Sequence, residues 1–192
     1  MRRAACWRDW LSSWSAVARR IRVPLGFVFA AAYLWLAQPT VKSIIIGSAV
    51  CVPGLWLRAL ASGHIRKNEQ VTSGGPYAYT RNPLYLGSTI LAAGFAIASR
   101  SLVVAAILAA IFVAVYLPVI WAEEEFLRSR FPDYAAYAER VPRFLPRLRR
   151  NPAAPQTAFS PRLYWSHREY SALAGAIVML GALTLKLLWF SR

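Results

Sequence analysis

Two short stretches of the chain combine residue types that could bind a polar ligand. In the first, Arg81 and Asn82 directly precede Pro83 and a run of apolar residues, and proline is favoured at the first position of a helix. Residues 74–76, with the sequence Gly-Gly-Pro, predict a turn shortly before them. Arg81 and Asn82 are therefore expected at a helix N-terminus, where backbone N–H groups and the helix dipole favour an anionic ligand group.

The second stretch is the acidic run from Glu123 to Glu125, at the end of the longest apolar segment. Three carboxylates oppose the helix dipole at this position, in a chain with 23 basic and only 8 acidic side chains. A cost of this kind indicates a cationic or hydroxyl-rich ligand. The alternative is that the run forms ion pairs with Arg128 and Arg130 at helical spacing, and the sequence leaves both interpretations open.

Apolar segments must position these residues. The chain is 57% hydrophobic, and its basic residues sit in blocks between charge-free stretches, which is typical of a polytopic membrane protein. A spanning helix needs about 20 residues; the last two segments reach this length, and the others reach it only if basic side chains at their ends extend to the headgroups. The five segments are residues 23–37, 43–57, 84–99, 101–122 and 170–190.

These segments predict an all-α fold, a polytopic integral membrane helical bundle of about five transmembrane helices. A soluble bundle is disfavoured because residues 102–122 show no polar stripe, and a signal peptide is a further alternative for the first segment. Of the 23 basic residues, 19 fall on one side of the expected topology, so that side is predicted to be cytoplasmic. The N-terminus is then cytoplasmic and the C-terminus outside, and we expect a bacterial inner membrane.

The chain is predicted to divide into five parts. Its basic N-terminal segment contains three tryptophans about one helical turn apart, which favours an amphipathic helix on anionic headgroups; a disordered basic tail is the alternative. The parts are the basic segment 1–22, a four-helix membrane region 23–122 with a motif loop at 62–83, a cytoplasmic segment 123–150 with acidic, tyrosine and proline motifs, a linker 151–169 and a C-terminal transmembrane helix 170–190.

Several classes of site are not indicated. No Gly-x-Gly sequence occurs, so neither a Rossmann fingerprint nor a P-loop is expected. His64 and His167 are the only histidines and stand apart from any cysteine or carboxylate cluster, so no metal site is expected. Membrane topology and anionic lipid account for the net charge of +15, so no nucleic-acid partner is expected either.

Three motifs follow one another between residues 63 and 147. They are Gly-Pro-Tyr-x-Tyr-x-Arg-x-Pro-x-Tyr-x-Gly, then Glu-Glu-x-x-Leu, then Tyr-x-x-Tyr-x-x-x-Val-Pro. In this order, with apolar helices between the first two, they resemble the isoprenylcysteine carboxyl methyltransferase family, which is related to the phospholipid N-methyltransferases. The resemblance implies an integral membrane enzyme that binds S-adenosylmethionine in cytoplasmic loops, without a Rossmann fold.

The resemblance also implies roles for individual residues. Arg81, Asn82 and Glu123 are predicted to be the catalytic residues, with Arg81 and Asn82 holding the cofactor carboxylate and Glu123 its ribose or amino group. Tyr77 and Tyr85 are predicted to wall the pocket, with anchoring at the membrane interface as the alternative. The full set predicted to bind the cofactor is Gln70, Val71, Tyr77, Arg81, Asn82, Tyr85, Glu123 and Glu124.

Two departures from the family pattern bear on the reaction. Asn82 replaces the family histidine, and an asparagine cannot carry a proton-linked role. Residues 117–121 lack the arginine that binds the substrate in eukaryotic carboxyl methyltransferases, so the acceptor stays open. We predict methyl transfer from S-adenosylmethionine to a lipophilic or membrane-embedded acceptor: a carboxylate, an amine or a similar nucleophile. The alternatives are an NADPH-dependent membrane reductase of the sterol or steroid type and a non-catalytic membrane interaction protein.

Overall fold

The computed structural model describes residues 28–66 and 70–190. Every regular element within these ranges is helical, which confirms the all-α prediction. The predicted N-terminal segment 1–22 lies outside the described residues. In chain order, a helix at residues 28–36 is followed by α2 (Val41–Ser62), η1 (Gly75–Ala78), α3 (Pro83–Ser99), α4 (Leu102–Ile111), η2 (Phe112–Tyr116), α5 (Leu117–Arg130), α6 (Tyr134–Arg140), α7 (Pro161–Ser166) and α8 (Tyr170–Phe190).

Three helical runs in the described residues are long and apolar enough to cross a membrane. They are α2, the run from α4 through α5, and α8. α3 is also apolar but has 17 residues, the lower end of the spanning range, and only residues 28–36 of the first predicted span are described as helix. The chain is therefore an integral membrane helical bundle, in which three of the five predicted spans have full spanning length.

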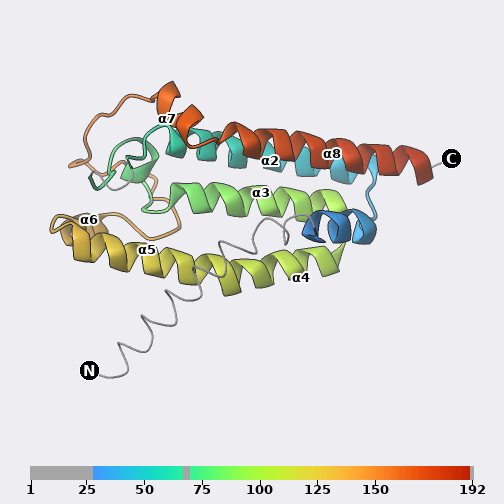
Figure 1. Ribbon diagram of the computed structural model, residues 1–192, viewed down its shortest axis with the longest axis horizontal. Coiled ribbons are helices and arrows are strands. Elements are labelled where there is room, and N and C mark those ends of the chain that lie inside the picture. Colours follow the sequence, from blue (N-terminus) through green and yellow to red (C-terminus); the bar gives the residue numbers. More distant parts are fainter. Residues whose placement is uncertain (1–27, 67–69, 191–192) are drawn as a thin grey trace, which may run out of the picture.

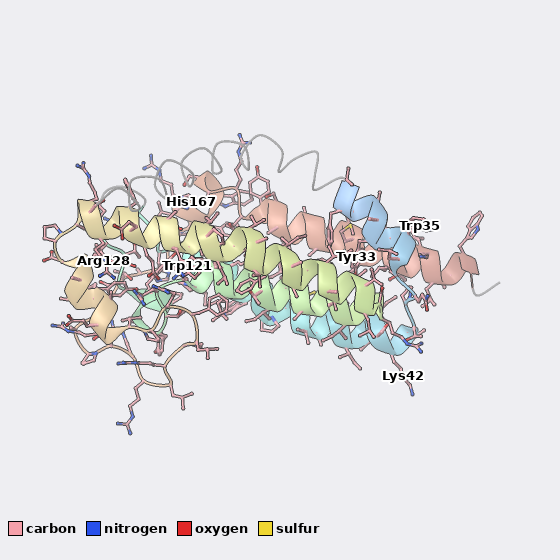
Figure 2. The ribbon with its side chains drawn as sticks, turned by 90° about the horizontal axis from the view of Figure 1, so that it is seen from below. Tyr33, Trp35, Lys42, Trp121, Arg128 and His167 are labelled. Atoms are coloured by element: carbon pink, nitrogen blue, oxygen red, sulfur yellow. The ribbon has the colours of Figure 1, made fainter. Side chains whose placement is uncertain are left out.

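The long helices lie side by side along the long axis of the molecule (Figure 1). η1, α6, α7 and the loops between them gather at one end of the bundle, which we call the loop end, and the C-terminus lies at the other end. Figure 2 places Trp121 and Arg128 of α5 toward the loop end, with Trp35 and Lys42 toward the opposite end. The segments that carry the predicted site residues therefore meet at one end of the bundle.

α2 and α3 form the most extensive helix–helix contact, and glycines make it close. A Cβ atom built on Gly47 would lie 2.5 Å from the carbonyl oxygen of Gly94, and one on Gly54 would lie 2.9 Å from that of Gly87. Any larger residue at these positions would collide with backbone. Small residues drive helix association in lipid because apolar side chains gain nothing there by leaving the acyl chains for a neighbouring helix.

The run from Leu102 to Arg130 is one continuous helix with a π segment in its middle. Pro118 lacks an N–H group and its ring crowds the preceding turn, and just before it the N–H of Leu117 bonds to the carbonyl of Phe112, five residues back. The run continues past residue 122, where the sequence predicted its end, to Arg130. The acidic run lies inside this helix, so the expected placement at a helix C-terminus is wrong.

α8 is tied to the rest of the bundle near both of its ends. The Lys186 ammonium donates hydrogen bonds to three carbonyl oxygens of residues 34–37, at the end of helix 28–36. Immediately before α8, Glu169 forms a 2.9 Å ion pair with Arg58 of α2. The range 151–169, predicted as a linker, contains α7 and bonds back to η1 through the Asn151 N–H and the Ala78 carbonyl, so it packs against the loop end.

Candidate active site

The loop before α3 is shaped by glycine and proline as the sequence predicts. Gly75 has a φ of 56°, in the left-handed region that glycine adopts without strain, and it opens the single turn of η1. α3 begins at Pro83, and Asn82 precedes it with a non-helical backbone of φ −125° and ψ 55°. The predicted turn and the predicted helix start are both confirmed. Their consequence is that Arg81 and Asn82 stand at the N-terminus of α3.

A cavity of about 290 Å³ lies at the loop end. Its size is close to the lower limit of about 300 Å³ for small-molecule pockets. Residues from the loop after α2, η1, the start of α3, α5 and α6 surround it. Every residue predicted to bind a cofactor lines this cavity: Gln70, Val71, Tyr77, Arg81, Asn82, Tyr85, Glu123 and Glu124. The structure therefore brings these eight residues together around one cavity, and their roles in binding a cofactor stay predictions.

The prediction missed other lining residues. Of these, Tyr134 and Tyr137 belong to the third sequence motif and lie on α6. Pro83 and Leu127 also belong to the motifs, and the others carried no chemical signal of their own. The lining residues outside the predicted set are Ile65, Arg66, Thr72, Pro83, Leu84, Phe126, Leu127, Tyr134 and Tyr137.

Glu124 is the centre of a buried charged network. Its side chain is 6% exposed, and its Oε2 accepts from Nη1 of Arg81 at 3.2 Å and from Arg143 at 3.0 Å. Its Oε1 accepts from the Asn82 amide at 3.0 Å. The same amide donates to the backbone carbonyl of Arg143 at 2.9 Å, which joins the segment after α6 to the start of α3. A buried carboxylate is tolerated here because each of its oxygens has a donor.

This network differs from the ion pairing that the sequence suggested, and it includes an arginine that the sequence did not single out. Ion pairing of the acidic run was expected, as one alternative, with Arg128 and Arg130 on the same helix; the pairs form instead with Arg81 and Arg143. Arg143 was not predicted to take part, since nothing local marks it among the nine basic residues between the acidic run and residue 170. Asn82 directs its amide at Glu124 and a backbone carbonyl, so it organises the site from within the protein.

Glu123 occupies a different environment from Glu124. It is half-buried, lines the cavity and accepts a 2.9 Å hydrogen bond from the Tyr85 hydroxyl, while within the described residues it forms no ion pair. The Tyr85 ring stands edge-on to the Tyr116 ring, with centroids 5.8 Å apart. Glu123 is therefore held at the cavity wall by a neutral donor, without an ion-pair partner among the described residues.

Tyrosines form much of the cavity wall. The Tyr137 hydroxyl donates to the backbone carbonyl of Tyr77 at 2.8 Å, which fastens α6 to η1, and the Tyr134 and Tyr137 rings lie 5.9 Å apart. Burial is the main cause that raises the pKa of Tyr77, and the charge of Glu123 raises it further. Burial likewise raises the pKa of Tyr134 and Tyr137. These phenols are therefore neutral hydrogen-bond donors at physiological pH.

Arg81 carries the one unpartnered buried polar side-chain atom among the described residues. Its Nε is enclosed and has no hydrogen-bond partner, although Nη1 binds Glu124. A buried donor without an acceptor is costly, and such a group calls for an explanation. Arg81 lines the cavity, so a ligand carboxylate would satisfy this donor, while Glu123 could accept from a ligand hydroxyl or ammonium group.

No group of three or more histidine, cysteine or acidic side chains that could hold a metal ion occurs within residues 28–66 and 70–190. The donor set of the cavity is suited instead to an organic ligand that carries both signs of charge. Its cationic side is Arg81, its anionic side is Glu123, and its aromatic walls offer surfaces for a planar ring.

Comparison with known proteins gives one family and two relatives. Residues 25–134, more than half of the chain, match the phospholipid methyltransferase family. The cobalt-zinc-cadmium resistance protein CzcN of Cupriavidus metallidurans is 37% identical over 115 residues, and the nickel-cobalt-cadmium resistance protein NccN of Alcaligenes xylosoxydans xylosoxydans is 34% identical over 115 residues. These matches cover 59% of this chain and 52% and 53% of the two relatives, so the chain spans about half the length of the curated relatives it matches. No solved structure matches the chain.

Proposed function

Because the chain belongs to the phospholipid methyltransferase family, we propose that it transfers a methyl group from S-adenosylmethionine to a lipophilic or membrane-embedded acceptor. The observation that carries the proposal is the cavity at the loop end, which is lined by Arg81, whose buried Nε has no partner, and by Glu123, which forms no ion pair among the described residues. S-adenosylmethionine has a carboxylate for the first and hydroxyl and ammonium groups for the second. Apolar helices adjoin the cavity, so a lipid could reach it from the bilayer.

The geometry divides the predicted cofactor-binding roles among the residues. Arg81 would hold the carboxylate through Nε, because its Nη1 and the Asn82 amide already bond to Glu124. Glu123 would accept from the ribose or the amino group. Tyr77 and Tyr85 would wall the pocket, and Gln70 and Val71 would close it from the loop after α2.

The residues of the chain would act by orientation and by exclusion of water. S-adenosylmethionine supplies a methyl group on a positively charged sulfur, and its displacement by a nucleophile requires alignment more than a dedicated base. Orienting two bound reactants can lower a barrier by roughly 7–11 kcal/mol. Glu124 fixes the Arg81 side chain, and α6 covers the cavity through Tyr134 and Tyr137. If the acceptor is an amine, Glu123 is the carboxylate available to stabilise the cationic product, since two guanidinium groups already neutralise Glu124.

We further propose that the loop end faces the cytoplasm of a bacterial inner membrane, with the C-terminus outside. Most basic residues of the connections lie at this end, and cytoplasmic loops carry an excess of arginine and lysine. A cytoplasmic cavity would have direct access to the soluble cofactor.

Binding of the cofactor tests this proposal first. S-adenosylmethionine and S-adenosylhomocysteine should each bind the detergent-purified full chain in calorimetry, and NADPH should not. Glu123→Ala should weaken binding about 10- to 150-fold, as expected for loss of a hydrogen bond to a charged group worth about 1.5–3 kcal/mol. Glu125→Ala is the matched control, because Glu125 is exposed and does not line the cavity. Folded protein that binds neither compound, or that binds NADPH instead, would contradict the methyltransferase proposal.

A further inference from the structure

The segment that follows α6 combines arginines with exposed leucines. Residues 143–150, which we call the basic strap, read Arg-Phe-Leu-Pro-Arg-Leu-Arg-Arg. Leu145 is 76% exposed and Leu148 is fully exposed. Arg147 and Arg149 are exposed as well. Basic and apolar side chains therefore alternate along one short exposed segment.

The strap runs back over the membrane helices. The Phe144 ring packs edge-on against Phe112, with centroids 5.5 Å apart, and Phe112 lies in the π segment of the run from Leu102 to Arg130. This run has 29 residues and is about 43 Å long at 1.5 Å per residue, which exceeds the roughly 30 Å of a bilayer core. Phe112 is ten residues, about 15 Å, into this run, so the Phe144 ring reaches between the helices while the strap turns back from the far tip of α5 toward the bilayer.

Backbone hydrogen bonds fix the strap against the start of α3 and η1. The Thr80 hydroxyl donates to the Phe144 carbonyl at 2.9 Å, and the N–H of Arg147 donates to the Tyr79 carbonyl at 3.0 Å. Asn151, directly after the strap, donates its N–H to the Ala78 carbonyl at 3.1 Å. Because the backbone is held on its inner side, the Leu145, Leu148, Arg147 and Arg149 side chains project from a preformed surface.

The charge of the strap is left uncompensated. Within residues 28–66 and 70–190, the sole ion pair of the strap joins Arg143 to Glu124; Arg147 and Arg149 form none. Arg140, Arg147, Arg149 and Arg150 line a hollow of about 460 Å³ in which no acidic residue takes part. Arg150 Nη2 already donates to the carbonyl oxygens of Ala154 and Pro155. Guanidinium groups bind phosphate oxygens through paired N–H donors, so the other three arginines suit a phosphate ligand.

We propose that the basic strap is a membrane-docking surface that binds the phosphate groups of anionic phospholipids in the adjacent leaflet. Arg147 and Arg149 pair with the headgroups, while Leu145 and Leu148 enter the boundary between headgroups and acyl chains. The same segment carries Arg143, so docking of the strap holds the Arg143–Glu124 pair beside the cavity. This surface does not depend on the reaction proposed above and would be present in a protein without methyltransferase activity.

A spin label on the strap tests the proposal in the full chain. The label is attached at Leu148→Cys in a background with Cys6→Ser and Cys51→Ala, and the protein is reconstituted in nanodiscs. In phosphatidylcholine mixed with anionic phosphatidylglycerol, the label should collide with lipid-dissolved oxygen; in phosphatidylcholine alone, it should collide with a water-soluble nickel chelate. The double variant Arg147→Gln with Arg149→Gln should shift the ratio of inserted to aqueous label about 30-fold toward water, at ~1 kcal/mol per arginine.

A matched pair of arginines serves as the control. Arg128→Gln with Arg130→Gln removes the same charge from exposed positions at the end of α5 and should leave the label in the lipid. An equal shift in this control would make the effect one of net charge and would overturn the proposal. A label that stays aqueous in both lipids would overturn it too. So would ordering of the label by soluble pyrophosphate in phosphatidylcholine without exposure to oxygen, since the arginines would then bind a free anion.

Discussion

The α2–α3 interface and the loop end are held together by opposite means. Between α2 and α3, cohesion comes from missing side chains: Gly47, Gly54, Gly87 and Gly94 let two backbones approach to distances at which a Cβ would not fit. At the loop end it comes from long charged side chains that meet at one buried carboxylate, Glu124. Each solution suits its surroundings, because lipid rewards close packing while a loop region must satisfy the polar groups it buries.

The difference also separates stability from binding. In the part of the chain that the structure describes, the glycine interface contains no buried side-chain donor without a partner. At the loop end, Arg81 Nε is buried without a hydrogen-bond partner, and both Arg81 and Glu123 line a cavity. Functional residues concentrate at sites where a protein leaves polar or charged groups without internal partners.

The largest expected effect comes from removing the centre of the charged network. Glu124→Ala should lower the free energy of unfolding by about 3–5 kcal/mol, because it leaves the Arg81 guanidinium buried without its counter-ion. Thermal unfolding in detergent, followed by circular dichroism, measures this. Glu125→Ala is the control, since Glu125 is exposed, and it should change stability by less than about 0.5 kcal/mol. Equal losses of stability in the two variants would show that Glu124 is not the centre of a stabilising charged network.

A smaller loss is expected at the glycine interface. Gly94→Ala places a methyl group 2.5 Å from Cys51 Sγ and 2.7 Å from the Gly47 carbonyl oxygen, and overpacking of this kind costs about 1–3 kcal/mol. The buried Cys51 thiol is a local probe, so its reaction with maleimide in a Cys6→Ser background should become faster.

The control for this prediction lies on α8. Gly181 has nothing within 4 Å of a built Cβ, so Gly181→Ala should be neutral or stabilising by up to about 1 kcal/mol through helix propensity. If Gly94→Ala left Cys51 as protected as Gly181→Ala does, the close contact of α2 and α3 would be less tight than described.

The smallest expected effect is on the pH dependence of stability at the loop end. Burial raises the pKa of Tyr137 above its ordinary value of about 10, so the neutral phenol favours the folded state. The stability it contributes is fully present below about pH 10 and is lost as the pH rises toward the folded-state pKa. Detergent-solubilised protein should therefore unfold more easily above about pH 10, and Tyr137→Phe should flatten this dependence by up to about 1.4 kcal/mol per pH unit.

At neutral pH the same variant should cost about 1 kcal/mol, because the hydrogen bond to the Tyr77 carbonyl is lost. Tyr79→Phe is the control, since Tyr79 is 36% exposed, and its alkaline profile should match the wild type. A Tyr137→Phe profile as steep as the wild-type profile would assign the alkaline unfolding to other groups.

Local features of the molecule were accessible to sequence reasoning. Pro83 starts α3 and Gly75 turns the chain before it, both as predicted. The all-α membrane fold also follows from composition and segment length. These features depend on neighbours a few residues away, through backbone preferences and helical periodicity, so a single chain without an alignment suffices to predict them.

Features that join distant segments were decided only by the tertiary structure. Glu123 and Glu124 are adjacent and chemically identical in the sequence, yet one points its charge into a cavity and the other is buried between Arg81 and Arg143. Nothing in the sequence separates Gly94, which a neighbouring helix requires, from Gly181, which faces open space. The amino-acid types determined which helices form and which chemical groups are present. Which side chains become partners depends on the segments that helix packing brings within a few ångströms, and no local sequence pattern encodes those distances.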